Sequence, residues 1–251
     1  MVKRTGPEAG REGPGVPDAA VLEEARILAE SRRRDAAISP DRYEPWQASE
    51  MFVRSGRARR AGEMLRRAGV FPAVGDACLE IGHGSLGWLG QLSCWGVRAG
   101  DMHGIELDAG RAAEARLRFP GADLRNGDAT RLPWPDGRFS LVITSTVFTS
   151  ILDLAVRRRL ADEIVRVLAP GGALLWYDFR VNNPANPHVR RVGRRELEQL
   201  FPTLRGAVAS ATLAPPVGRA VVPVSWLLGE ILETIPFLRT HLLAVLVKGE
   251  E

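Results

Sequence analysis

Three glycines with a fixed spacing follow an apolar run about a third of the way along the chain. The segment Cys78-Leu-Glu-Ile-Gly-His-Gly-Ser-Leu-Gly87 contains G-x-G-x-x-G, at Gly82, Gly84 and Gly87. Glycine permits a tight turn and lets a ligand approach the backbone, and the N-terminus of a following helix can face that ligand. The spacing therefore predicts a strand, a ligand-binding turn and a helix.

An acidic residue beside the turn helps to decide which ligand it binds. The same spacing occurs where a turn holds the pyrophosphate of a dinucleotide, but Glu80, two residues before Gly82, would repel a pyrophosphate. A carboxylate suits a ligand with an ammonium and a sulfonium group, such as S-adenosylmethionine (SAM). The alternative is that Glu80 caps the next helix. We place His83 beside the cofactor; a role as catalytic base is less favoured.

Further candidate residues stand at the ends of the next predicted strands. Glu106 and Leu107 end the second strand, where an acid can hold ribose hydroxyls. Asp128 and Ala129 follow the third, where an acid can accept from an adenine amine; an Asx turn is the alternative. Thr144 ends the fourth. Because ligands of open α/β sheets bind outside the carboxyl ends of the strands, we expect these residues to line the cofactor site.

Two residues are candidates for the substrate side of the site. Asp178 follows Trp176-Tyr177 at the end of the fifth predicted strand and could be a general base for a hydroxyl. Pairing with Arg180 is an equally favoured structural alternative. His188 is the second candidate base.

Composition limits the classes of protein to consider. The 251 residues carry 34 basic and 30 acidic side chains, a net charge of +4, and 45% of them are hydrophobic, enough for a sizeable core. The two cysteines, Cys78 and Cys94, form no disulfide framework or metal motif. We find no signal peptide, and these features favour the cytoplasm.

The apolar pattern divides the chain into three parts. Residues 1–17 are rich in Gly, Pro and charge and predict a disordered tail. Residues 18–71 predict a helical extension. Residues 72–251 alternate short apolar strands with helices, which predicts an α/β fold with a mainly parallel, Rossmann-like sheet. Ser150 and Asp153 predict a capping box for a helix over 151–168.

Five motifs in order make the chain similar to a known family. They are E-x-G-x-G at 80–84, G-I-E-L at 104–107, G-D-A at 127–129, L-P-W-P-D-G-R-F at 132–139 and R-V-L-A-P-G-G at 166–172. The chain resembles class I SAM-dependent methyltransferases of the small-molecule type related to quinone C-methyltransferases. The resemblance implies a seven-stranded sheet with a C-terminal antiparallel hairpin, SAM as cofactor and a small organic acceptor. Leu86 and Ser140 depart from the family pattern.

Alternatives remain open at this stage. A SAM-binding module without turnover would explain Leu86 and Ser140. A nicotinamide-dependent oxidoreductase rests only on the glycine spacing. Nucleic acid is not expected as a substrate, because we identify neither stacking groups nor a backbone track.

An apolar insert breaks the last part of the pattern. Residues 221–237 are rich in Val, Leu and Ile and include Trp226 and Phe237, but are interrupted by Glu230 and Glu233. The insert is too short and too charged to span a membrane. Packing on the sheet edge is the favoured interpretation. A lid over a lipophilic acceptor and a contact with a membrane surface are the alternatives. Oligomeric state and acceptor identity are not predicted.

Overall fold

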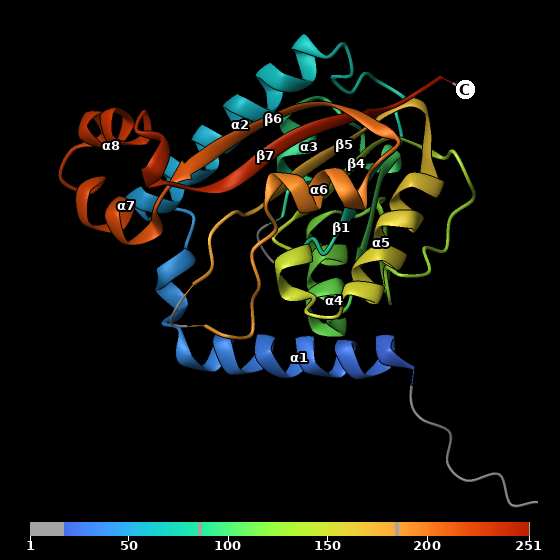
Figure 1. Ribbon diagram of the computed structural model, residues 1–251, viewed down its shortest axis with the longest axis horizontal. Coiled ribbons are helices and arrows are strands. Elements are labelled where there is room, and N and C mark those ends of the chain that lie inside the picture. Colours follow the sequence, from blue (N-terminus) through green and yellow to red (C-terminus); the bar gives the residue numbers. More distant parts are fainter. Residues whose placement is uncertain (1–17, 85–86, 184–185, 251) are drawn as a thin grey trace, which may run out of the picture.

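One seven-stranded sheet organises the protein in its computed structural model, in the order β3-β2-β1-β4-β5-β7-β6 (Figure 1). The structure describes residues 18–84, 87–183 and 186–250, so the predicted tail over 1–17 and Leu86 lie outside the described residues. The strands are β1 (Cys78–Ile81), β2 (Met102–Glu106), β3 (Asp123–Asn126), β4 (Phe139–Ser145), β5 (Leu168–Phe179), β6 (Leu204–Leu213) and β7 (Arg239–Lys248).

Strand direction confirms the predicted fold class. The first five strands pair in parallel, whereas β7 runs antiparallel to both β5 and β6. Every residue of β1 and β2 is buried, as expected for strands covered on both faces. The hairpin of β6 and β7 is therefore the C-terminal antiparallel pair that the motifs implied.

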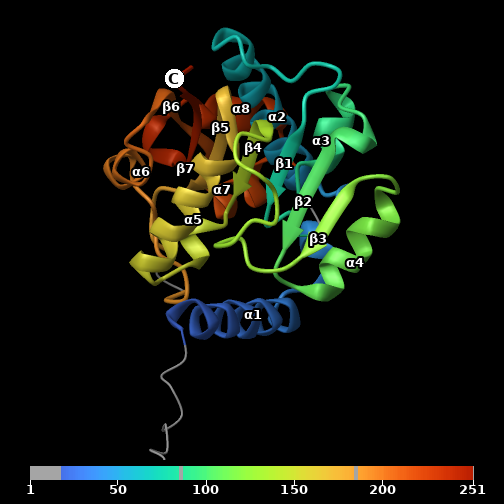
Figure 2. The ribbon, with the colours of Figure 1, turned by 90° about the vertical axis from the view of Figure 1, so that its right-hand side faces the viewer.

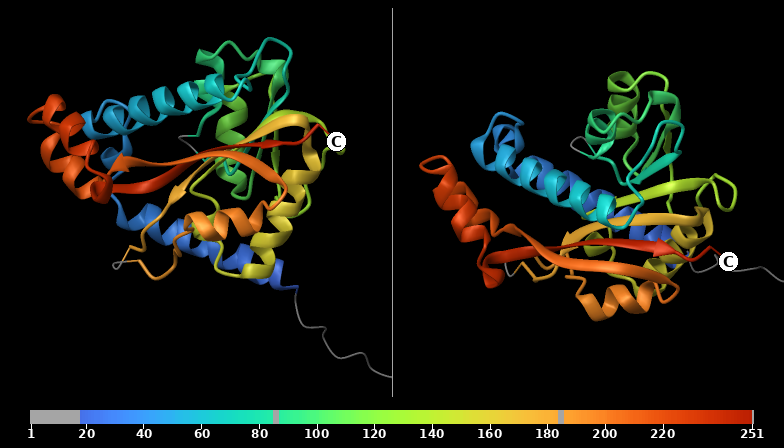
Figure 3. Two further views of the ribbon diagram at one scale, coloured as in Figure 1. Left: turned by 45° about the horizontal axis from the view of Figure 1, so that its top comes forward. Right: turned by 90° about the horizontal axis from the view of Figure 1, so that it is seen from above.

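Helices cover both faces of the sheet, and each face has its own core (Figures 2 and 3). The helices are α1 (Ala19–Ala37), α2 (Ala48–Arg67), α3 (Leu89–Cys94), α4 (Ala109–Arg118), α5 (Leu154–Val167), α6 (Arg194–Leu200), α7 (Pro215–Val221) and α8 (Trp226–Glu233). Short 3-10 turns are η1 (Pro40–Tyr43), η2 (Ala99–Asp101), η3 (Phe148–Ser150) and η4 (Pro236–Leu238).

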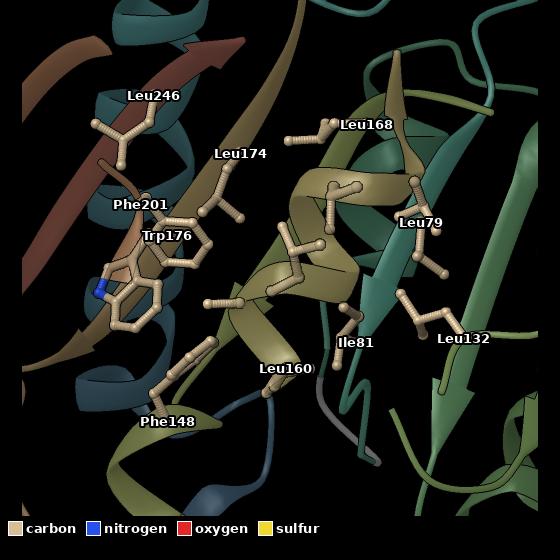
Figure 4. Close-up of a cluster of buried hydrophobic side chains, with 14 of the residues drawn as sticks. Leu79, Ile81, Leu132, Phe148, Leu160, Leu168, Leu174, Trp176, Phe201 and Leu246 are labelled. Atoms are coloured by element: carbon tan, nitrogen blue, oxygen red, sulfur yellow. The ribbon is translucent and has the colours of Figure 1, made fainter. Parts of the chain in front are cut away.

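The alternation of side chains along each strand separates the two cores. Leu79 and Trp176 face α5 and α6, in the cluster drawn in Figure 4. Tyr177, the next residue of β5, faces α2 and α3 with Leu175. Glu80 follows the same rule and faces α2 and α3. The alternation of side chains therefore places each candidate residue on a strand on one face of the sheet or the other.

The predicted helical extension packs into both cores rather than apart from them. Ala20 of α1 belongs to the cluster of α5, and Ala61 and Leu65 of α2 belong to the cluster of α3. Burial of these side chains ties the extension to the sheet. The first 3-10 turn exposes Tyr43, and Trp46 after it is also exposed, so neither forms part of the core.

Helix α5 begins later than predicted and without a capping box. Asp153 is itself the N-cap, and its carboxylate accepts from the backbone N–H groups of Ala155 and Val156. The prediction that Ser150 pairs with Asp153 is wrong, because residues 148–150 form η3 instead. The apolar residues Val156, Leu160 and Ile164 still form the buried stripe of the helix.

The pairing of β6 with β7 leaves no room for a side chain at Gly206. A Cβ there would lie 1.9 Å from the carbonyl oxygen of Val245, a backbone atom that cannot swing aside. We predict that Gly206→Ala lowers the free energy of unfolding by roughly 1–3 kcal/mol through overpacking. Urea unfolding measures this. Gly249→Ala is the matched control, since its added Cβ meets nothing within 4 Å; equal effects of the two changes would contradict the prediction.

Candidate functional site

The glycine turn connects β1 to α3 and is held by backbone conformations that favour glycine. Gly82 and Gly84 have φ values of 68° and 54°. A Cβ on Gly82 would lie 2.7 Å from the Cγ2 atom of Val147, which follows β4. The turn after β1 and the loop after β4 therefore approach each other closely at the carboxyl edge of the sheet, where the sequence predicted a binding site.

Glu80 precedes this turn and accepts hydrogen bonds at the start of α3. Both of its carboxylate oxygens accept from the backbone N–H of Trp88, at 2.7 and 2.8 Å, and the side chain has no exposed surface. A Cβ on Gly87 would lie 2.4 Å from Glu80 Oε1, so the third glycine makes room for the carboxylate. This is the capping geometry that the sequence offered as the alternative for Glu80; its predicted cofactor contact stays a prediction.

Glu106 fixes the same turn from the end of β2. Its Oε2 atom accepts from the backbone N–H of Gly84 at 2.8 Å, and its Oε1 atom accepts from Asp108 N–H at 3.0 Å. His83 is also buried, with Nδ1 3.1 Å from Gly84 O. Within the described residues, His83 Nε2 is a buried atom without a hydrogen-bond partner. Glu80, Gly82, His83, Gly84 and Glu106 thus form one cluster.

Burial dominates the electrostatics of the cluster. Removal from water raises the pKa of Glu80 from 4.5 to about 8, against the opposing effects of the Trp88 N–H and of Arg57. A cation placed here would favour the ionised carboxylate, whereas a pyrophosphate would meet two acidic side chains. The two acidic side chains therefore fit a cationic ligand better than a dinucleotide phosphate.

Arg57 of α2 is a site residue that the sequence did not single out. Its guanidinium carbon lies 4.8 Å from the ring centre of Trp88 and 5.6 Å from that of Tyr177. Tyr177 Oη is 2.8 Å from Thr212 Oγ1, and its ring stacks on His241. No local sequence motif marks Arg57, because the residues that it contacts, Trp88 and Tyr177, are distant from it in the sequence.

Asp128 and its neighbours line the next strand ends. Asp128 forms the Asx turn considered above: Oδ1 accepts from Thr130 N–H at 2.8 Å, and Oδ2 accepts from the Thr130 hydroxyl. Ala129 follows it and packs against the α5 core. Leu107 is half-buried, and its carbonyl accepts from the Asn126 side chain at 2.9 Å. Their contacts with a cofactor remain predictions.

The end of β4 carries a strained residue that sequence reasoning also missed. Thr144 is buried beside Ile81 and Trp176 in the sheet register. Two residues later Thr146 has a φ of 55°, a conformation that threonine rarely adopts. Its N–H donates to Tyr177 O at 2.8 Å. Strained backbone of this kind concentrates at functional sites, and Thr146 stands exposed at the carboxyl edge.

Asp178 lies on the opposite face of the sheet from Glu80, and both of its carboxylate oxygens accept hydrogen bonds. Oδ1 accepts from the Thr149 hydroxyl at 2.6 Å and from Phe179 N–H, and Oδ2 accepts from Thr149 N–H at 3.1 Å. The predicted pairing with Arg180 is wrong, since Arg180 donates to the carbonyls of Pro236 and Arg239. Burial raises the pKa of Asp178 to about 6.

His188 lies beside helix α1. Its ring is about half-exposed, and Nε2 lies 3.9 Å from Glu30 Oε2 of α1. Among the described residues Asp178 contacts Thr149 and Phe179 instead, so the two predicted acceptor-side residues have different partners.

Helix α1 crosses the carboxyl edge of the sheet (Figures 1 and 2). At one end Asp18 pairs with Arg159 of α5, and at the other Asp35 pairs with Arg111 of α4 at 2.5 Å. Between them Glu23 accepts from Leu152 N–H. Burial and the neighbouring Asp128 raise the pKa of Glu24 in α1.

A cavity of about 210 Å³ adjoins the glycine turn on its α4 side. Arg54 of α2, His83, Gly84 and Phe119 contribute to its lining. Within the described residues no group of three His, Cys, Asp or Glu could hold a metal ion. The carboxyl edge thus offers glycine backbone, acids and an adjoining cavity.

Glu80 makes a pH-dependent contribution to stability that can be measured. Because its folded-state pKa of about 8 exceeds 4.5, the folded protein binds the proton more tightly than the unfolded chain. Its stabilising effect is complete below pH 4.5 and is lost as pH rises towards 8. Between these values we predict a loss of up to roughly 1.4 kcal/mol per pH unit, absent in Glu80→Gln.

Urea unfolding across this pH range compares the wild type with Glu80→Gln. Glu198→Gln, an exposed change on α6, serves as the control. A constant difference between wild type and Glu80→Gln at every pH would contradict the predicted burial effect.

Comparisons with known proteins agree on one kind of domain. Residues 79–176 match the family profile described as "Methyltransferase domain". A probable S-adenosylmethionine-dependent methyltransferase of Mycolicibacterium smegmatis is 32% identical over 40% of this chain and 41% of its own. A demethylmenaquinone methyltransferase of Clavibacter sepedonicus is 31% identical over 56% of each chain. A phthiotriol/phenolphthiotriol dimycocerosates methyltransferase of Mycobacterium tuberculosis is 43% identical over 43% of this chain and 40% of its own.

These matches cover only about half of each curated relative. Among solved structures, a geranyl diphosphate C-methyltransferase from Streptomyces coelicolor has a TM-score of 0.56 at 18% identity, covering 76% of both chains. A methyltransferase from Methanosarcina mazei has a TM-score of 0.52 at 18% identity, covering 72% of this chain and 96% of its own. At such identity the structures support the fold alone. With the five motifs and the sheet order, these findings identify residues 79–176 as a domain of the class I SAM-dependent methyltransferase family.

Proposed function

We propose that this protein transfers a methyl group from SAM to a small lipophilic acceptor. The observation that carries the proposal is the glycine turn held between the buried acids Glu80 and Glu106 at the carboxyl edge of the sheet. That arrangement provides backbone access for a ligand, and a bound cation would favour the ionised form of Glu80. It fits a sulfonium cofactor and disfavours the nicotinamide alternative.

The described residues supply a plausible set of cofactor contacts. In this proposal Gly82 and Gly84 give the methionine end access to the backbone, Glu106 takes the ribose hydroxyls and Asp128 takes the adenine amine. Arg57 adds a cation beside Glu80, which suits the carboxylate of an amino acid. His83, Leu107, Ala129 and Thr144 complete the proposed surroundings.

Methyl transfer of this kind requires alignment more than acid chemistry. When bound, SAM supplies a methyl carbon activated by the positive sulfur; the acceptor forms the new bond, and the sulfur keeps the electron pair of the broken one. A hydroxyl acceptor also loses its proton. The chain contributes orientation and exclusion of water, worth on the order of 7–11 kcal/mol where positioning is good. Helix α1 over the carboxyl edge supports water exclusion.

The lipophilic character of the acceptor is supported by the relatives. Their names refer to demethylmenaquinone and to phthiotriol dimycocerosates. Whether the acceptor atom is oxygen or carbon stays open in this proposal.

Asp178 serves this reaction as a positioning residue in our proposal, rather than as the base considered from the sequence. Both of its oxygens accept from protein donors, and it joins η3 to the end of β5. His188, at the surface beside α1, remains the candidate for a group near the acceptor entrance.

Calorimetric titration tests the cofactor proposal. We expect SAM and S-adenosylhomocysteine to bind and NADH not to bind. Asp128→Ala should weaken binding of both sulfur ligands about tenfold or more, because it removes the proposed adenine acceptor. Asp162→Ala, an exposed change on α5, is the matched control. A folded protein that binds neither sulfur ligand would refute the proposal.

Turnover separates the enzyme from a binding module that lacks catalysis. Incubation with SAM labelled on its methyl group and with quinone, phenol and polyketide acceptors should give a labelled, organic-soluble product. Binding of SAM without any product across the screen would favour the module.

A pair of variants distinguishes positioning from base catalysis at Asp178. We expect Asp178→Asn and Thr149→Val each to cost roughly 1–3 kcal/mol of unfolding free energy, because each disturbs the buried hydrogen bonding between Asp178 and Thr149. The pH profile of kcat on the acceptor found in the screen should keep its shape in both. A loss of about 10²–10⁴ in kcat confined to Asp178→Asn would instead assign it as the base.

A further inference from the structure

We propose that one exposed apolar surface docks the protein on an anionic lipid surface. We call it the α8 surface; it consists of Val224, Trp226, Leu227, Leu228, Ile231 and Phe237. The inference concerns a different part of the molecule from the methyl-transfer site and does not rest on the proposed function. It extends one of the alternatives that the sequence offered for residues 221–237.

Exposure of the α8 surface is unusual for a folded protein. Leu227 is 70% exposed and Phe237 is 81% exposed, and the other four side chains are exposed as well. All six fall within 14 consecutive residues, whereas the remaining exposed large hydrophobic residues are distributed over several elements. Contiguous apolar patches of this kind mark contacts with proteins or membranes. The expected packing of a helix on the sheet edge is confirmed, since α8 contacts the edge strand β6 through Glu233 and Thr212, but most of its large apolar side chains face outward.

The inward face of α8 shows that this orientation is built in. Glu233 is buried, and its Oε1 atom accepts from Thr212 N–H at 3.0 Å. Its Oε2 atom lies 3.8 Å from Arg60 of α2. Gly229 packs so closely that a Cβ would lie 2.9 Å from Val222 and 3.2 Å from Phe52. A helix with its carboxylate inside and its leucines outside cannot rotate without breaking these contacts.

Positive charge beside the α8 surface indicates what it meets. A cavity of about 330 Å³ between η1, the start of α2 and α7 is lined by Arg42 and Arg219, together with Ser39, Gln47 and Ser49. Asp41 supplies one negative charge against the two guanidinium groups. Pro223 also lines this cavity and is the residue before Val224 of the α8 surface. An anionic headgroup in the cavity would therefore bring its acyl chains to the apolar side chains.

The position of α7 and α8 suits contact with a flat surface. Figures 1 and 3 show the two helices at one end of the molecule, beyond the ends of β6 and β7. No helix among the described residues is long and apolar enough to cross a membrane. The guanidinium groups of Arg42 and Arg219 beside the apolar side chains favour an anionic lipid surface over a second apolar protein face. Lipid is therefore the occupant that the surface fits best.

Vesicle sedimentation tests the proposal with the full-length chain. We expect wild type to sediment with vesicles of phosphatidylcholine and phosphatidylglycerol, and more weakly with phosphatidylcholine alone. Leu227→Glu and Phe237→Glu should each reduce binding at least about tenfold, because a charge replaces an apolar side chain that would enter the lipid surface. Leu117→Glu is the matched control, since Leu117 is 84% exposed on α4, away from this surface.

A charge reversal tests the headgroup part separately. Arg42→Glu with Arg219→Glu should remove the preference for anionic vesicles and leave weak binding to neutral ones. Circular dichroism and melting temperatures confirm that each variant is folded. The proposal fails if folded wild type sediments with neither vesicle, if Leu117→Glu lowers binding as much as Leu227→Glu, or if the double change keeps the anionic preference. It also fails if ultracentrifugation shows a dimer that Leu227→Glu dissociates.

Discussion

A buried carboxylate under the glycine turn is the constraint on which the rest of the site depends. Glu80 accepts from Trp88 N–H with both oxygens, and Glu106 accepts from Gly84 N–H across the turn. A buried acid without such donors would cost far more to hold in place. The close approach of Gly87 and the left-handed glycines follow from this bonding. A cation beside these acids would favour their ionised form, whereas a phosphate would oppose it, so the acids that shape the turn also separate a sulfonium ligand from a phosphate.

The pleat of the sheet then divides the chemistry between two faces. Glu80 and Tyr177 turn towards α2, where Arg57 lies against the aromatic rings, whereas Asp178 turns towards α5 and engages Thr149. The two faces meet at the carboxyl edge, where Gly82 and Val147 bring the loops after β1 and β4 together. A reacting centre built there can take cofactor contacts from one face and support from the other.

The sequence predicted local patterns well and distant contacts poorly. Strand spacing and the five motifs predicted the sheet and its final hairpin, because buried strands and glycine turns leave local signals. Arg57 left none, since its partners lie in three other elements. Thr146 left no local signal either, because a threonine in the sequence does not indicate a positive φ. The apolar run of 221–237 was visible, but its outward orientation depends on Glu233 meeting Thr212, a contact 21 residues apart.

Helix α2 links the two surfaces that the protein presents. Phe52 packs edge-on against Trp226 of the α8 surface, with ring centres 5.1 Å apart, and Gly56 lies against Glu233. One residue later Arg57 contacts the rings beside Glu80. A single rigid helix therefore joins the α8 surface to the glycine turn. Because Phe52 and Arg57 lie within two turns of one helix, α2 would hold the proposed methyl-transfer site in a fixed position relative to a lipid surface.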